Sequence, residues 1–424
     1  MVHKLNNKSI FFSEMRSVLT VNVIVAALGY FVDIYDLLLF GIVRVASLKE
    51  IGVADSELLE KGMLLINSQM FGMLVGGIFW GILGDKKGRL SVLFGSILLY
   101  SLSNIANAFV TSVDAYVILR WIAGFGLAGE LGAAITLVAE TLPQDKRGYG
   151  TTLVASVGIL GAVAAALVGD LFSWKTSYII GGVMGLVLLT MRVSMYESHL
   201  FGVAREQSSL ARGDFFMLFK SQKRFFKYLR CILIGVPVWY VVGILVTFSP
   251  EISKSLEVRG SVSAGQAIMY CYLGLALGDL LSGIISQWLK SRIRAVKVFL
   301  FVALLMCLVY FFVRNISPNI FYLICFGMGL GAGYWAVFVT TAAEQFGTNL
   351  RATVTTTVPN FVRGSVVLLT LLFQAFRTQL AGNERGLLIS AALVGGITFL
   401  LAFVSLFKME ESFHHHLNYN ENVD

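Results

Sequence analysis

Several ionisable side chains stand inside long apolar segments of this 424-residue chain, where a charge is costly, and four of them are prominent. They are Asp33, Asp36, Glu130 and Arg363. A charged side chain at the centre of a bilayer costs roughly 2.5–3.5 kcal/mol on insertion scales, so such groups face the protein interior or a wet cavity. Carboxylates in this setting can carry protons, and a buried guanidinium can bind an anion. These residues therefore suggest proton-coupled handling of an anionic molecule.

The spacing and surroundings of these residues suggest a role for each. Asp33 and Asp36 are three residues apart, so a helix places them on one face, where their like charges make at least one a candidate proton carrier. Glu130 lies among glycines, where helices approach closely, so it either has a tight partner or lines a cavity. Arg363 lies near the middle of its apolar segment and can bind a carboxylate or phosphate through two donors. The alternative for each is a structural ion pair or a helix cap.

Other side chains in apolar segments are weaker candidates. Arg120, ten residues before Glu130, suits snorkelling to the surface or a structural pair. Asp279, in the second half of the chain, is an uncertain candidate. Aromatic side chains at central positions of the later segments could stack on an organic substrate, although aromatics in a helix bundle more often serve packing; they are Tyr240, Tyr334 and Trp335.

The composition places the chain in a membrane. Apolar residues make up 57% and charged residues 14%, whereas a soluble domain carries about 25% charged residues. The mean hydropathy is +0.77. Five prolines, 42 glycines without a period and four cysteines exclude collagen-like, disordered and disulfide-stapled proteins. The net charge of +8 would allow nucleic-acid binding, but the basic residues form short clusters between apolar runs, so no nucleic-acid partner is expected.

The apolar runs predict an all-α integral membrane protein with 12 transmembrane helices, because about 20 apolar residues span the hydrocarbon core. The expected spans are 17–44, 61–84, 90–110, 114–139, 149–170, 174–195, 229–249, 263–288, 296–313, 318–343, 352–376 and 385–407. With both termini in the cytoplasm, most Lys and Arg residues fall on the inner side, as the positive-inside rule requires. The expected location is the plasma membrane, which is the inner membrane if the source is bacterial.

Residues 196–228 form the longest polar stretch between spans and divide the chain. We therefore expect an N-terminal six-helix bundle at 1–195, a cytoplasmic linker at 196–228, and a C-terminal six-helix bundle with a short tail at 229–424. The linker interleaves aromatic with basic residues. That composition suits an interfacial helix on the anionic inner leaflet; the alternative is a solvated linker.

The two halves repeat, which makes them pseudo-symmetric. Glu140 is followed seven residues later by Arg147, and Glu344 is followed at the same interval by Arg351. Parallel repeats of six spans are typical of transporters whose substrate site lies between the halves near the midplane.

Residues 81–89 read Gly-Ile-Leu-Gly-Asp-Lys-Lys-Gly-Arg. This stretch resembles the loop 2–3 signature of the major facilitator superfamily, and the resemblance covers nearly the whole chain. It implies that Asp85 and Arg89 latch the outward-facing state at the cytoplasmic side. The Glu-to-Arg interval is similar to that of sugar porters and organic-ion carriers, which implies structural gate roles for Glu140, Arg147, Glu344 and Arg351.

Three further stretches narrow the resemblance. Residues 120–134 resemble the metabolite:proton symporters, and Asp33-Ile-Tyr-Asp36-Leu is similar to motifs of the aromatic-acid and phosphate:proton symporters. The resemblance implies proton coupling at Asp33, Asp36 and Glu130. Asn360-Phe-Val-Arg363-Gly resembles a motif of anion-carrying members, which implies that Asn360 and Arg363 contact the substrate.

We therefore expect a secondary transporter that imports a small anionic organic metabolite by proton symport through alternating access. The proton gradient supplies the energy, and the expected partners are the substrate, protons and the lipid bilayer. No cofactor or metal is expected, and the chain should act as a monomer. The sequence shows no combination of a nucleophile and a base that would suggest an enzyme. The alternatives are a proton-driven exporter of a drug or secreted metabolite, and a phosphate or siderophore carrier.

Overall fold

The computed structural model describes residues 19–87, 89–130, 132, 142, 147–196 and 215–413. The first part of the chain forms long helices joined by short loops. Their bounds are α2 Val21–Glu50, α3 Leu58–Lys87, α4 Arg89–Asn107, α5 Val113–Leu127, α7 Arg147–Leu171 and α8 Trp174–Tyr196. We refer to these six as the N-terminal group.

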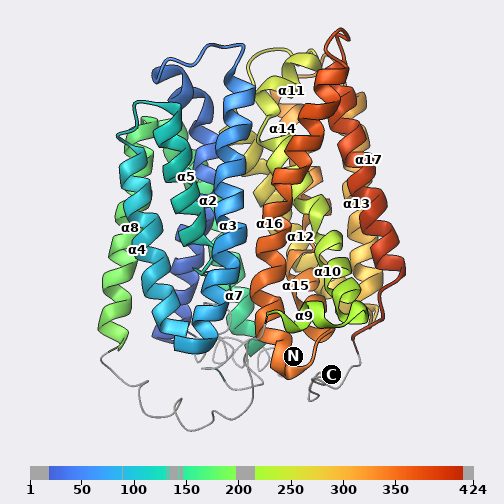
Figure 1. The fold of residues 1–424 in the computed structure, drawn as a ribbon. Helices are drawn as coiled ribbons and strands as arrows, with labels where there is room; N and C mark the ends of the chain where they lie inside the picture. Colours follow the sequence, from blue (N-terminus) through green and yellow to red (C-terminus); the bar gives the residue numbers. More distant parts are fainter. Residues whose placement is uncertain are drawn as a thin grey trace, which may run out of the picture.

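The later part of the chain forms a second set of helices, the C-terminal group, preceded by the four-residue helix α9 Met217–Lys220. Its members are α10 Gln222–Tyr240, the π-helical segment η1 Val241–Val246, α11 Ser249–Ser255, α12 Ala264–Trp288, α13 Arg292–Phe312, α14 Pro318–Ala332, α15 Trp335–Glu344, α16 Thr348–Gln379 and α17 Gly386–Phe407. Figure 1 shows the blue and green N-terminal group on one side and the yellow and red C-terminal group on the other.

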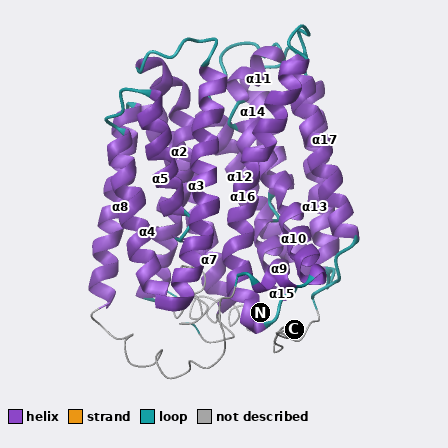
Figure 2. Cartoon of the chain, viewed as in Figure 1, coloured by secondary structure: helices purple, strands orange, loops and turns teal. Residues whose placement is uncertain are grey.

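The described residues contain helices and loops but no strand, as Figure 2 shows. Ten of the helical segments are long and apolar enough to cross a membrane, and α4 supplies a shorter apolar helix over Ser91–Asn107. The prediction of an all-helical membrane protein is confirmed at this level.

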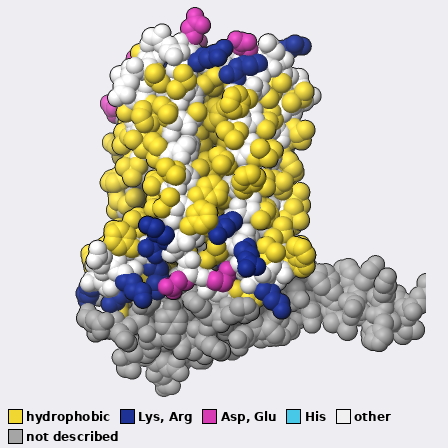
Figure 3. Space-filling model, turned by 90° about the vertical axis from the view of Figure 1, so that its right-hand side faces the viewer, with side chains coloured by type: hydrophobic (Ala, Val, Ile, Leu, Met, Phe, Trp, Pro, Cys, Tyr) yellow, Lys and Arg dark blue, Asp and Glu magenta, His cyan; other side chains and the backbone are white. Residues whose placement is uncertain are grey.

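An apolar belt surrounds the helices. Figure 3 shows hydrophobic side chains over the middle of one face, with Lys, Arg, Asp and Glu gathered near its two ends. Exposed members of the belt include Phe301 and Phe312 on α13 and Leu400 on α17. Large apolar side chains face outward because lipid tails, unlike water, do not penalise them.

Short polar side chains begin several helices. Ser112 accepts a hydrogen bond from the N–H of Ala115 at the start of α5, and Ser263 does the same for Gln266 in α12. Such caps satisfy N–H groups that have no partner within the helix. Each of these helices therefore begins at a polar residue that precedes its apolar run.

Glycines let neighbouring helices approach within each group. A Cβ atom added at Gly124 of α5 would collide with the backbone carbonyl of Gln69 in α3. In the C-terminal group, a Cβ at Gly329 of α14 would collide with the carbonyl of Cys271 in α12. Close packing of small residues is how membrane helices associate without a hydrophobic driving force. Contacts between the groups run through α3 with α16, α7 with α12, and α2 with α12.

Two predicted spans differ in detail from the structure. The span expected at 318–343 is interrupted at Gly333 and Tyr334, which separate α14 from α15. The carboxylate of Asp279 on α12 accepts a hydrogen bond from the N–H of Ala336 at 3.0 Å and so supports the new helix start. The span expected at 229–249 begins earlier, because α10 starts at Gln222 inside the predicted linker, and it continues as the π-helix η1.

Candidate functional site

Helix α2 carries a row of small and acidic residues toward the interior. Gly29, Asp33 and Asp36 are four and three residues apart, so they share one face of the helix. Both aspartates are fully buried. Two turns of α2 therefore bring two carboxylates into the core of the protein.

Asp33 faces Arg363, which lies halfway along α16. Asp33 Oδ2 and Arg363 Nη2 are 3.8 Å apart, and both side chains are at most 2% exposed. Neither carboxylate oxygen of Asp33, nor Nε or Nη1 of Arg363, has a hydrogen-bond partner among the described residues. This loose ion pair joins the N-terminal group to the C-terminal group.

Glu130, just beyond α5, has a different partner. Arg192 on α8 donates from Nη1 to Glu130 Oε2 at 3.0 Å and from Nη2 to Glu130 Oε1, and both side chains are buried. Arg192 was not among the site residues predicted from the sequence. Its position inside the predicted span 174–195 was the signal that marked it as an intramembrane charge.

Arg120 is fully buried on α5 and does not snorkel to the surface. Its Nη2 donates to Asn104 Oδ1 at 2.7 Å, and its guanidinium lies over the ring of Tyr178 at 5.0 Å. Asp36 packs against Gly181 of α8, and its two carboxylate oxygens have no hydrogen-bond partner among the described residues. These groups all belong to the N-terminal group of helices.

Asn360 lies three residues before Arg363 and forms a second polar contact between the groups. Its Nδ2 donates to the carbonyl of Ala128 at 3.0 Å and to that of Thr356 at 3.1 Å. The predicted Asn360–Arg363 pair thus contacts the N-terminal group at two points near Glu130 and Asp33.

The predicted aromatic substrate contacts are bonded within the C-terminal group. The hydroxyl of Tyr240 donates to the carbonyl of Ala391, and that of Tyr334 to the carbonyl of Ile234. Trp335 is partly buried, and its ring lies 5.3 Å from that of Phe338. A substrate role for these three residues stays a prediction.

The predicted gate residues lie mostly outside the described residues. The side chains of Asp85, Arg89, Arg147 and Arg351 are not described, although their backbones are helical, and Glu140 is outside the described residues altogether. Glu344 at the end of α15 pairs with Arg292 of α13, with Nη2 and Oε1 3.1 Å apart. The gate roles stay predictions.

Polar contacts between the groups also gather at the end of the molecule that carries α11, which we call the α11 end (Figure 1). Arg44 of α2 is fully buried, and its Nη2 lies 2.7 Å from Glu251 Oε1 on α11. Arg44 also donates to the carbonyl of Leu58 at 3.2 Å and lies over the Phe248 ring at 4.8 Å. Sequence reasoning did not single out this pair, because both residues stand near the ends of apolar runs.

Two more contacts reinforce this end. Gln266 of α12 donates to Asp170 Oδ2 of α7 at 2.8 Å, and Thr370 of α16 donates to Asn67 Oδ1 of α3 at 2.6 Å. Together with the Arg44 pair, these contacts hold the two groups together at the α11 end.

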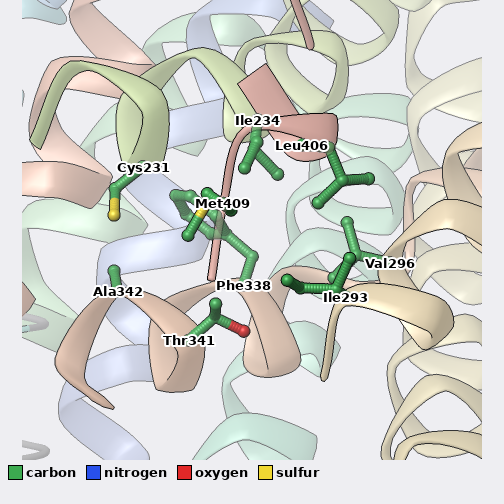
Figure 4. Close-up of a pocket in the computed structure, with 9 residues that line it drawn as sticks. All are labelled: Cys231, Ile234, Ile293, Val296, Phe338, Thr341, Ala342, Leu406 and Met409. Carbon is green, nitrogen blue, oxygen red and sulfur yellow. The ribbon is translucent and has the colours of Figure 1, made fainter. Parts of the chain in front are cut away.

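A small pocket within the C-terminal group is lined by side chains of α10, α13, α15 and α17 and by the segment that follows α17 (Figure 4). Its walls are apolar apart from Thr341, whose hydroxyl donates to the carbonyl of Val337. The pocket contains no charged side chain and none of the predicted site residues, so it offers nothing to bind an anion.

An all-helical membrane chain with charged pairs buried between two groups of helices has the makeup of a membrane transporter and not of an enzyme. The chain belongs to the Major Facilitator Superfamily, whose family model matches residues 26–370. The predicted membership is confirmed, and with it the expectation of a multi-pass membrane transporter.

Some relatives match about three quarters of the chain, whereas others match less than half of it and span less than half of their own length. It is 26% identical to the niacin transporter NiaP of Acinetobacter baylyi over 362 residues, which cover 77% of this chain and 80% of the relative. It is 25% identical to the gentisate transporter of Corynebacterium glutamicum, covering 76% of this chain and 73% of the relative. The match to the benzoate transport protein of Acinetobacter baylyi, at 27% identity, spans only 42% of that protein.

A solved structure shows the same fold. The crystal structure of a D-xylose-proton symporter superposes with a TM-score of 0.68 at 17% identity, covering 92% of this chain and 98% of that chain. At this identity the likeness shows the fold alone.

Proposed function

We propose that this protein is a secondary active transporter that imports a small organic anion together with protons by alternating access. The observation that carries the proposal is the buried ion pair between Asp33 and Arg363, which joins the two groups of helices. A charge pair in this position responds both to an anion, which competes for Arg363, and to a proton, which neutralises Asp33.

The proposed cycle follows from that competition. A substrate carboxylate binds Arg363 in place of Asp33, because a guanidinium can hold a carboxylate with two charge-assisted hydrogen bonds. Asp33, having lost its cation, takes up a proton, since an unpaired charge in a dry interior is costly. Asp36 and Glu130 are the other buried carboxylates for which the sequence predicts proton coupling. Release on the other side reverses both steps.

The substrate class we propose is an aromatic carboxylate. Two relatives that each match about three quarters of the chain are a niacin transporter and a gentisate transporter. Both molecules present a carboxylate on a flat ring, which Arg363 can bind by its charge. Asn360, which already donates hydrogen bonds beside the pair, is placed to add a second polar contact.

We further propose that 1–195 and 229–424 act as two rocking bundles with twelve spans in total, both termini in the cytoplasm and the α11 end outside. The Arg44–Glu251 pair and the neighbouring contacts support a state in which the outer end is closed. Opening this end requires those contacts to break, and the chain can do so as a monomer.

The test uses the full-length protein in proteoliposomes with radiolabelled nicotinate as the probe. We expect an inward proton gradient to drive accumulation, and unlabelled benzoate and gentisate to compete. Asp33→Asn should abolish the stimulation by the gradient, while Arg363→Gln should abolish binding in a thermal-shift assay. Inorganic phosphate and a ferric siderophore serve as alternative substrates. Uptake that ignores the gradient, or efflux driven by an inward gradient, would overturn the symport proposal.

A further inference from the structure

The three candidate proton carriers differ in the hydrogen-bond donors and cations that contact their carboxylates. Glu130 receives two hydrogen bonds from one guanidinium, that of Arg192, so each of its oxygens has a donor. Asp33 has no hydrogen-bond partner among the described residues and lies 3.8 Å from its cation. A two-fold, charge-assisted contact fixes both the geometry and the charge of a carboxylate.

The Glu130–Arg192 pair is enclosed within the N-terminal group of helices. Gly29 of α2 lies so close that an added Cβ atom would collide with both Glu130 Oε1 and Arg192 Nη2. The ring of Tyr100 on α4 lies beside the pair, and its hydroxyl is buried. The contacts that define this pair therefore come from α2, α4, α8 and the end of α5, which move as one body if the two groups rock.

The Asp33–Arg363 pair is different because its members lie on different groups. Rocking of one group against the other can change the distance between Asp33 and Arg363, whereas it leaves Glu130 and Arg192 together. Both oxygens of Asp36 lack a hydrogen-bond partner among the described residues, and the cation that acts on it, Arg120, belongs to its own group. The charged groups near Asp33 are Arg363 of α16, Glu130 and Asp36, and the neighbouring tyrosines are Tyr30 and Tyr272.

We propose that Arg192 is a positioning residue that holds Glu130 as a fixed, ionised carboxylate, so that the proton of the transport cycle is carried by Asp33 and not by Glu130. If Glu130 took up a proton, Arg192 would remain buried with an unmatched charge. The pair instead anchors the end of α5 to α8 and supports the face of α2 that presents Asp33. This inference rests on the proposed symport and names the carboxylate that performs it.

Transport assays test the positioning role through pH dependence. The double variant Glu130→Gln/Arg192→Gln removes both charges and leaves no buried charge unpaired. We expect the ratio of nicotinate uptake with and without the proton gradient to stay within about twofold of wild type. Arg192→Gln alone should add a second step to the pH profile of uptake, because Glu130 then titrates, and Arg192→Lys should restore the wild-type profile. Loss of gradient stimulation in a folded double variant would overturn the inference.

Infrared spectroscopy gives a readout that needs no substrate, so failure of the inference can be told apart from failure of the proposed function. Difference spectra between acid and neutral pH report protonated carboxylic acids through their carbonyl stretch. We expect Asp33→Asn to remove a band that the double variant keeps. A band that disappears in Glu130→Gln/Arg192→Gln and persists in Asp33→Asn would assign the proton to Glu130 and refute the inference, whether or not nicotinate is transported.

Discussion

Neutralising Glu251 should open the α11 end of the protein. The substitution Glu251→Gln leaves the side chain its size but removes the charge that faces Arg44 across the two groups of helices. Arg44 Nη2 lies 2.7 Å from one Glu251 oxygen and 2.8 Å from the other. Without that carboxylate, Arg44 stays fully buried with neutral acceptors only, which are the carbonyl of Leu58 and the amide oxygen left at position 251.

The size of the effect follows from the burial of the pair. Breaking a buried ion pair by removing one partner typically costs about 3–5 kcal/mol. Glu251 is 19% exposed, so we expect the lower end of that range. Because each 1.4 kcal/mol is a factor of ten, a cost of about 3 kcal/mol shifts the ratio of closed to open states by about 100-fold.

Spin labels on the two groups measure this shift directly. Glu57 precedes α3 and Lys254 lies on α11, and both are exposed at the α11 end. The four native cysteines are buried, so labels should react at cysteines introduced at these two positions. We expect Glu251→Gln to add a longer-distance population in pulsed electron double resonance.

The matched control is the exposed pair between Lys175 and Glu50. It lies at the same end but within the N-terminal group, and its two side chains are 48% and 51% exposed. Exposed pairs contribute little, so Lys175→Gln should leave the distances unchanged. If Glu251→Gln left the distances unchanged, as this control should, in a protein that remains folded, then the Arg44–Glu251 pair would not be what keeps the α11 end closed.

Three further changes test other parts of the structure. Burial alone would raise the pKa of Glu411, but the hydrogen bonds that it accepts from the start of α13 outweigh burial and lower its pKa. The ionised carboxylate therefore stabilises the fold at pH values above its ordinary pKa. This stabilisation is lost as the pH falls through the lower pKa of the folded state. The difference in the free energy of unfolding between wild type and Glu411→Ala, about 1 kcal/mol at neutral pH, should thus shrink in acid. A difference in unfolding free energy that does not change with pH would contradict the capping role. Gly124→Ala should destabilise the protein by about 1–3 kcal/mol when it is denatured in mild detergent, because the added methyl group collides with the carbonyl of Gln69. Gly283→Ala is the neutral control, because a methyl group added there has no atom within 4 Å. Asp279→Ala removes the acceptor at the start of α15 and should lower stability by about 1 kcal/mol, whereas Asp279→Asn should recover part of it; equal losses would refute the cap.

The sequence was sufficient for the all-helical membrane class because lipid imposes simple rules on composition. Long apolar runs must be helical in a bilayer, since every backbone group needs a partner within the segment. The runs around Asp33 and Arg363 therefore predicted buried helices, and both are buried in α2 and α16. The interruption at Gly333 was not predicted, because it depends on the carboxylate of Asp279 arriving from a different helix.

Pairing of charges, by contrast, was decided by the tertiary structure. Residue types and depth marked Asp33, Glu130 and Arg363 as unusual, since each charge stands in an apolar run. Which cation meets which carboxylate depends on the packing of helices far apart in the sequence: Glu130 meets Arg192 of α8, and Asp33 meets Arg363 of α16. Hydropathy is a local property, whereas an ion pair requires two side chains to arrive at one point in space, and only the folded helices bring them there.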